Sequence, residues 1–225
     1  DNTAVGWKAL SATVSAVENV SIGSNSLRDL VSGNFNVAIG TGAMAAVVST
    51  TRNIAVGTDA LNNTQSGDFN IAIGTYSLYK TSVGENLGLG DSTLFENTTG
   101  AYNLAIGNVS LQNNTTGSYN TVVGRQSMFK STLGKNNTAI GFSTGFNLTG
   151  ISDNNTFLGY QADTTSGTII TNATAIGANA TVTMSNTIQL GDPNVTLVQT
   201  SGTVSASAFV GDGSGLTNVS GGITD

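Results

Sequence analysis

The chain has 225 residues, of which 38% are hydrophobic, only 9% are charged and 29 are glycine, with a formal net charge of −6. This composition excludes a disordered chain, and seven basic residues exclude the positive stripe that nucleic-acid binding needs. The chain contains no cysteine and no histidine, so a disulfide framework, a thiolate nucleophile, a Ser-His-Asp triad and a histidine-ligated zinc are excluded too. No run of 18 apolar residues occurs, so we expect no membrane insertion by this segment.

A glycine-ended motif repeats along residues 1–191. Glycine returns most often every 17 residues and usually closes the pattern asparagine, any residue, a small residue, an aliphatic residue, glycine. Units this short cannot bury a core alone and must stack on their neighbours. We therefore predict an all-β fold, a parallel β-roll or β-helix solenoid with about 17 residues per coil. The repeat glycines are Gly6, Gly23, Gly40, Gly57, Gly74, Gly90, Gly107, Gly124, Gly141, Gly159, Gly177 and Gly191.

Each repeat predicts a short strand just before its glycine. Alternate side chains of a strand face opposite sides, so Ile71 and Ile73 share one face and Ala72 lies on the other. We expect the large aliphatic residues to face the core. The competing helical solenoid is disfavoured because each glycine costs about 1 kcal/mol inside a helix. The small residues expected to face outward, where another chain can approach, are Ala38, Ala55, Ala72 and Ala105.

A second apolar position follows each repeat glycine by four residues and predicts the opposite wall of a narrow core. Two or three large aliphatic side chains per coil form a thin core, so we expect lateral association into a homotrimer. The residues at this second position are Leu10, Leu27, Met44, Leu61, Leu78, Leu94, Leu111 and Met128.

The asparagine of the motif predicts a ladder of side-chain amides that bond from one coil to the next. A residue needed in every coil is better explained by stacking than by ligand binding, and the glycine is explained by a turn or a close backbone approach. The ladder residues are Asn36, Asn53, Asn70, Asn86, Asn103, Asn120 and Asn137.

Aromatic residues precede the ladder asparagine in four coils and are the candidate binding residues. They either pack at a contact between chains or contact a sugar or receptor, because aromatic side chains are enriched at both kinds of interface. The candidates are Phe35, Phe69, Tyr102 and Tyr119, and the same place is taken in intervening coils by Glu18, Arg52 and Glu85.

The repeated motif, followed by an alanine- or serine-leucine pair and a threonine-glycine loop, resembles the head repeats of trimeric autotransporter adhesins with YadA-like heads. The similarity covers about residues 2–191. It implies a left-handed parallel β-roll of three chains, displayed outside a cell and used for attachment. The repeat is longer than that family's commoner coil, and we expect the extra residues, as in 62–67 and 97–100, to form a protruding loop.

The repeats end after Gly191. Pro193, the only proline, cannot donate a hydrogen bond to a continuing ladder. Residues 192–225 are predicted to form a non-repetitive glycine- and serine-rich neck or linker. Within them, residues 202–219 are similar to the neck of phage tail fibres and of related bacterial surface fibres.

These features predict a non-enzymatic module of an extracellular fibre or adhesin, on a virion tail or a bacterial cell surface. Its expected partners are two further copies of the chain and a cell-surface glycan or protein receptor. No cofactor or metal is expected, because calcium-binding rolls need an aspartate in each turn.

Two alternatives stay open. A tailspike-type depolymerase of surface polysaccharide needs only two carboxylates, but the acids do not recur as a close pair on adjacent coils, apart from Asp59 and Asp91 soon after the repeat glycine. An ice- or crystal-binding face needs ranks of threonine-x-threonine, and these are missing from successive repeats.

Overall fold

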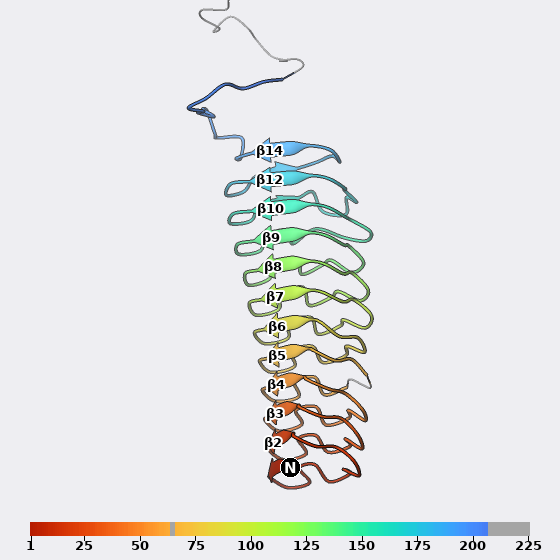
Figure 1. The fold of residues 1–225 in the computed structure, drawn as a ribbon. Coiled ribbons are helices and arrows are strands. Elements are labelled where there is room, and N and C mark those ends of the chain that lie inside the picture. The colour runs from red at the N-terminus through yellow and green to blue at the C-terminus, as the bar shows by residue number, and fades with distance from the viewer. Residues whose placement is uncertain (64–65, 207–225) are drawn as a thin grey trace, which may run out of the picture. The chain divides into compact units, whose positions relative to one another are not determined.

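A computed structural model describes residues 1–63 and 66–206, and residues Asp1–Val195 form one compact unit. In this unit twelve short strands lie side by side in one sheet, and each strand is one coil further along the stack (Figure 1). The described residues contain no helix. The predicted fold class, an all-β parallel solenoid with about 17 residues per coil, is therefore confirmed.

The main sheet contains every strand except β11 and β13, which pair with each other in a second, two-stranded sheet. The strand bounds are β1 (Thr3–Val5), β2 (Val20–Ile22), β3 (Val37–Ile39), β4 (Ile54–Val56), β5 (Ile71–Ile73), β6 (Leu87–Leu89), β7 (Leu104–Ile106), β8 (Thr121–Val123), β9 (Thr138–Ile140), β10 (Thr156–Leu158), β11 (Asp163–Thr164), β12 (Thr174–Ile176), β13 (Thr181–Val182) and β14 (Ile188–Leu190).

All strand pairs are parallel and place the same repeat position side by side. Ile71 of β5 pairs with Ile54 of β4 on one side and with Leu87 of β6 on the other. The register survives between β5 and β6 although that repeat is one residue shorter, so the loop absorbs the difference. Equivalent side chains consequently form straight columns along the stack.

The repeat glycines lie where the backbones of neighbouring coils come closest. Gly74 has a φ of 131°, and a Cβ atom at this position would lie 2.5 Å from the carbonyl carbon and oxygen of Gly90. No side chain fits at that distance, and L-residues rarely adopt that φ. The glycine of the motif is thus required by the coil spacing itself.

The expected facing of the strands is wrong. The middle residue points into the core in strands β2 to β10 and in β12, and Ala38, Ala55, Ala72 and Ala105 are fully buried. The flanking aliphatic residues point outward, and Ile73 is 38% exposed. The coil is too narrow for large side chains on both walls: a Cβ added to Gly88, in the middle of β6, would already lie 2.6 Å from Ser77 Oγ and 2.8 Å from Thr93 Oγ1.

The second apolar wall lies in the core as predicted. Leu27, Leu78 and Leu111 are fully buried opposite the strands. These leucines have left-handed backbones, with φ values of 46° to 52°. Such a conformation costs about 1–2 kcal/mol per residue, and it is held by burial and by hydrogen bonds to the next coil, such as Leu78 N–H to the Thr93 carbonyl at 2.9 Å.

Parts of two predictions fall outside the described residues. Residues 64–65 belong to the expected loop at 62–67, and residues 207–225 contain most of the expected neck at 202–219. The compact unit that begins at Asp1 ends at Val195, close to the predicted boundary between residues 191 and 192. The described residues 196–206 contain no strand.

Candidate binding surface

The four candidate aromatic residues lie in one column on the outside of the stack. Phe35, Phe69, Tyr102 and Tyr119 are about half exposed, and each has a left-handed backbone with φ between 59° and 62°. The residues at this place in the intervening coils, Glu18, Arg52 and Glu85, share that backbone conformation. We call these seven residues the aromatic column.

Neighbouring side chains of the aromatic column contact one another. The guanidinium carbon of Arg52 lies 5.2 Å from the ring centre of Phe35 and 5.5 Å from that of Phe69, so one cation is placed between two aromatic faces. Tyr102 and Tyr119 stack with their ring centres 4.9 Å apart. Ring faces in the column are therefore partly covered by neighbouring column residues, and the column presents ring edges together with charged side chains to whatever covers it.

Glu85 places a negative charge within this column. Hydrogen bonding of the Tyr102 hydroxyl toward this carboxylate and the negative charge of the carboxylate raise the pKa of Tyr102. A shallow hollow of about 420 Å³ lies beside Glu85 and is lined by Phe69, Tyr102 and the first residues of β5, β6 and β7. The hollow is mainly apolar, which suits a packing partner better than a charged ligand.

The predicted ladder asparagines are buried and bond from coil to coil. Asn103 Nδ2 donates to Asn86 Oδ1 at 3.2 Å and to the Gly117 carbonyl at 2.9 Å. Asn103 Oδ1 accepts from the backbone N–H and Nδ2 of Asn120, at 3.1 and 3.0 Å. The same bonding recurs along Asn36, Asn53, Asn70, Asn86, Asn103, Asn120 and Asn137, and it extends to Asn2 and Asn19 on one side and to Asn155 on the other.

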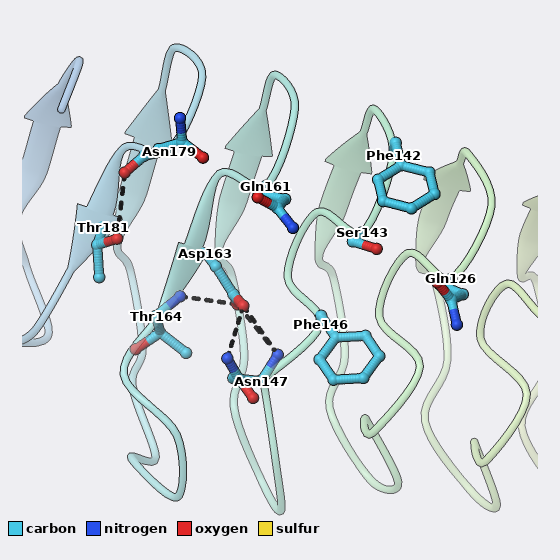
Figure 2. A pocket seen from close by; sticks show the side chains of 10 residues that line it. All are labelled: Gln126, Phe142, Ser143, Phe146, Asn147, Gln161, Asp163, Thr164, Asn179 and Thr181. Carbon is cyan, nitrogen blue, oxygen red and sulfur yellow. Dashed lines mark hydrogen bonds between the residues drawn. The ribbon is translucent and has the colours of Figure 1, made fainter.

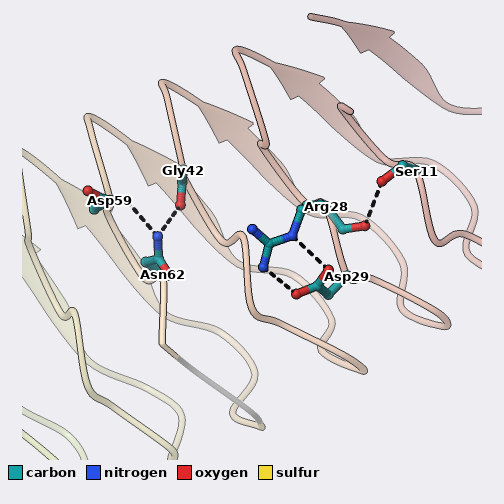
Figure 3. A network of polar contacts seen from close by, with 6 residues as sticks. All are labelled: Ser11, Arg28, Asp29, Gly42, Asp59 and Asn62. Carbon is teal, nitrogen blue, oxygen red and sulfur yellow. Dashed lines mark hydrogen bonds and ion pairs between the residues drawn. The ribbon is translucent and has the colours of Figure 1, made fainter. Parts of the chain in front are cut away.

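Acidic side chains near the repeat turns are bonded to their surroundings. Asp59 accepts from Nδ2 of Asn62, which also donates to the Gly42 carbonyl, and Asp29 forms an ion pair with Arg28 at 2.6 Å (Figure 3). The bond to Arg28 lowers the pKa of Asp29. Asp91, the other acid noted in the sequence, accepts from the backbone N–H of Thr75 at 3.0 Å. These carboxylates brace turns rather than facing each other as a pair.

A second hollow, of about 540 Å³, lies beside the last regular coils and was missed from the sequence (Figure 2). At its floor the Asp163 carboxylate accepts hydrogen bonds from Asn147 and Thr164. A signal was present, because the leucine or methionine at the second apolar position ends with Met128 and the same place is taken next by Gly145 and Asp163.

Within residues 1–63 and 66–206 there is no group of three or more acidic side chains that could hold a metal ion. The same residues include no helix long and apolar enough to cross a membrane. Comparisons with family models, with curated proteins and with solved structures gave no significant match.

Proposed function

We propose that this chain is a non-enzymatic segment of an extracellular trimeric fibre, in which three copies lie side by side and carry an attachment surface. The observation that supports this proposal is the outer face of the main sheet. The third residue of all twelve strands is aliphatic, and nine of these residues are exposed in the single chain. A face of this size is exposed to water at a cost unless a partner covers it.

The repeat of that face favours a second copy of the same chain as the partner. Ile39, Ile73 and Leu89 belong to one column that advances by one residue per coil, at the spacing of parallel strands, about 4.8 Å. Only a surface with the same spacing can pack against every member of such a column. Copies aligned along a common axis meet this condition and form a closed assembly.

Three copies, rather than two, follow from the resemblance to YadA-like head repeats, which also supports the left-handed winding. From the sequence we expected the alanines to contact another chain. Because the aliphatic side chains face outward instead, we now assign that contact to them. A trimer would carry three aromatic columns, and three weak contacts to one target raise the overall affinity by avidity. Attachment to a cell-surface glycan or protein, from a virion tail or a bacterial surface, is the function that this arrangement suits.

The competing hypothesis is a depolymerase that cleaves surface polysaccharide. The bonding of Asp29, Asp59 and Asp91 to turns disfavours it, because a glycosidase needs two carboxylates free to face one glycosidic bond. Incubation of the purified chain with capsular polysaccharide, followed by a reducing-sugar assay, separates the two. Release of sugar would favour the enzyme.

A pair of charge substitutions tests the assembly. In Ile73→Asp a carboxylate enters the middle of the aliphatic face, and we expect the oligomer to dissociate in sedimentation equilibrium while the circular dichroism spectrum is retained. Val48→Asp is the matched control, because Val48 is an exposed aliphatic residue in a loop rather than in a strand. Equal sedimentation of the two variants and the wild type would contradict the proposed contact.

A further inference from the structure

The second hollow exists because the core changes its pattern after β9. In the regular coils a small residue in the strand faces a leucine or methionine four residues after the repeat glycine. Across the next two coils the sizes are exchanged: Gly145, in the turn after β9, takes the place of the leucine, and Phe157, in the middle of the following strand β10, is large and fully buried. A Cβ atom at Gly145 would lie 3.1 Å from the Phe157 ring, so the large strand residue fills the space that the leucine occupies elsewhere.

As a consequence, the turn after β10 does not have to supply a leucine to the core. Residues Asp163–Thr164 form strand β11 instead of a left-handed turn, and they pair with β13. Because side chains alternate along a strand, Thr164 and Val182 are buried and Asp163 points to the outside. The position that is a core leucine in most coils is here a carboxylate at the floor of a surface hollow.

Carboxamide side chains line the wall above this carboxylate. Gln126, Gln161 and Asn179 each lie two residues after a repeat glycine, with φ values of 60°, 53° and 57°, so they recur along the stack (Figure 2). Within the part of the chain that the structure describes, the side-chain amides of Gln126 and Gln161 make no hydrogen bond. Each therefore offers one acceptor oxygen and two donor hydrogens to a ligand.

The carboxylate is fixed in position from below. Asp163 accepts from the Asn147 backbone N–H at 3.1 Å, from Asn147 Nδ2 at 3.0 Å and from the Thr164 backbone N–H at 2.8 Å. Lys130 Nζ donates to Asn147 Oδ1 at 2.9 Å, which sets the orientation of that amide. Burial raises the pKa of Asp163 to about 6, against the opposing effect of these hydrogen bonds and of Lys130, so the group is ionised at neutral pH.

Aromatic rings complete the hollow. Phe142 and Phe146 lie at its side, and Phe142 stacks on Tyr160 with ring centres 5.6 Å apart. The volume of about 540 Å³ lies within the range of small-molecule sites, roughly 300–1,000 Å³. Phe146 likewise stacks on Phe129, and Arg125 and Lys130 lie over the Phe142 and Phe146 rings, so each ring has part of its surface covered and part turned to the hollow. The lining thus combines a held carboxylate, carboxamides without a hydrogen bond and partly exposed rings in one concave surface.

We propose that this hollow binds an uncharged sugar residue of a glycan. Sugar hydroxyls donate to a carboxylate and both donate to and accept from carboxamides, while the C–H face of a sugar ring packs on an aromatic face. An anionic ligand is opposed by Asp163, and a wholly apolar one would leave the polar lining without hydrogen bonds. This proposal specifies the class of ligand for the proposed attachment function, and its biological role depends on that function.

The test uses titration calorimetry and saturation-transfer NMR with a panel of neutral sugars: glucose, galactose, mannose, rhamnose and N-acetylglucosamine, each as the methyl glycoside. We expect at least one of them to bind. The double variant Gln126→Ala/Gln161→Ala should weaken that binding by about tenfold or more, because two ligand hydrogen bonds are lost. Gln112→Ala is the matched control, since it removes the same side chain outside the hollow and should leave binding unchanged.

Absence of binding by the whole panel at 10 mM or more, roughly the weak end of specific recognition, would overturn the proposal. Equal binding by the double variant and the wild type would overturn it as well, and so would tighter binding of methyl glucuronide than of any neutral sugar. All the lining residues belong to one chain. A chain that binds sugar but does not assemble would therefore contradict the trimer and support this site. A chain that assembles but binds no sugar would support the trimer and contradict this site.

Discussion

The regular coils from β1 to β9 and the altered coils from β10 to β14 solve the same packing problem in opposite ways. In the regular coils the strand contributes alanine and the turn contributes leucine. After β9 the turn contributes Gly145, and the next strand, β10, contributes Phe157, whose ring fills the space beside Gly145. A close-packed core can thus be filled by a large side chain from either wall. After this change the turn that follows β10 does not supply a core leucine, and Asp163 lies at the surface in its place.

Neighbouring coils lie closer together at Gly74, in the regular coils, than at Gly177, in the altered coils, and this difference predicts the strongest effect on stability. Gly74→Ala puts a Cβ atom 2.5 Å from the Gly90 backbone, whereas the nearest atom for Gly177→Ala is 3.1 Å away, at Gly191. We expect Gly74→Ala to lower the free energy of unfolding by more than about 4 kcal/mol, as a backbone clash does, and Gly177→Ala to cost less. Urea denaturation measures both, and equal costs would show that the coil spacing does not depend on the regular repeat.

The exchanged core pair tests the comparison directly. Phe157→Ala should cost about 3–5 kcal/mol, because it leaves a cavity. Gly145→Leu alone should also destabilise the fold, because the new side chain meets the Phe157 ring. The double variant restores the regular pattern, and the φ of Gly145, 58°, is already left-handed and close to the values of the core leucines. We expect it to be more stable than either single variant in a double-mutant cycle, and additive losses would contradict the exchange.

The asparagine ladder should be stronger in the middle than at its end. Asn103 accepts two hydrogen bonds from Asn120, whereas Asn155, the last rung, accepts only one, from the backbone of Ala173. Asn103→Ala should cost about 2–3 kcal/mol, because buried donors and acceptors lose their partners. Asn155→Ala should cost less, and the exposed Asn108→Ala should be close to neutral. Thermal unfolding of the three variants ranks them, and any other order would weaken the ladder as a source of stability.

The smallest expected effect is a pH dependence specific to the altered coils. The pKa of Asp163 is raised to about 6 in the folded chain, so between pH 4 and pH 6 the folded chain holds a proton that the unfolded chain has released. Stability must then fall as pH rises through this window.

We expect the fold to be more stable at pH 5 than at pH 7 by about 1 kcal/mol, and this difference to be lost in Asp163→Asn. The chain has no histidine, so no imidazole titrates in the same range. Urea unfolding at the two pH values measures the difference. A stability that rises from pH 5 to pH 7, or a difference that persists in the variant, would contradict the assignment to Asp163.

The sequence predicted the stacking and its period but placed the two faces of the strand the wrong way round. Alternation of Ile71, Ala72 and Ile73 shows that one face is large and the other small. It does not show which is inside, because that depends on the width of the coil and on the opposing Leu78. The rule that large aliphatic side chains face the core holds for wide sheets and fails in a coil this narrow. The exposed face is better explained as a surface for a partner.

Other features depended on geometry that no local pattern carries. A buried leucine with a φ near 50°, as in Leu78 and Leu111, contradicts local preference and is imposed by hydrogen bonds to the next coil. The hollow above Asp163 required knowing that Phe157 and Gly145 compensate each other across the core. The aromatic column could be found from the sequence, because equal repeat positions stack, but its exposure in the single chain could not.

We propose that the aliphatic outer face of the sheet packs against further copies of the chain, and native mass spectrometry of the wild-type chain over a range of concentrations measures the number of copies. We expect one dominant species at three times the chain mass of 22.7 kDa, about 68 kDa. A species of 22.7 kDa that persists at every concentration would contradict it.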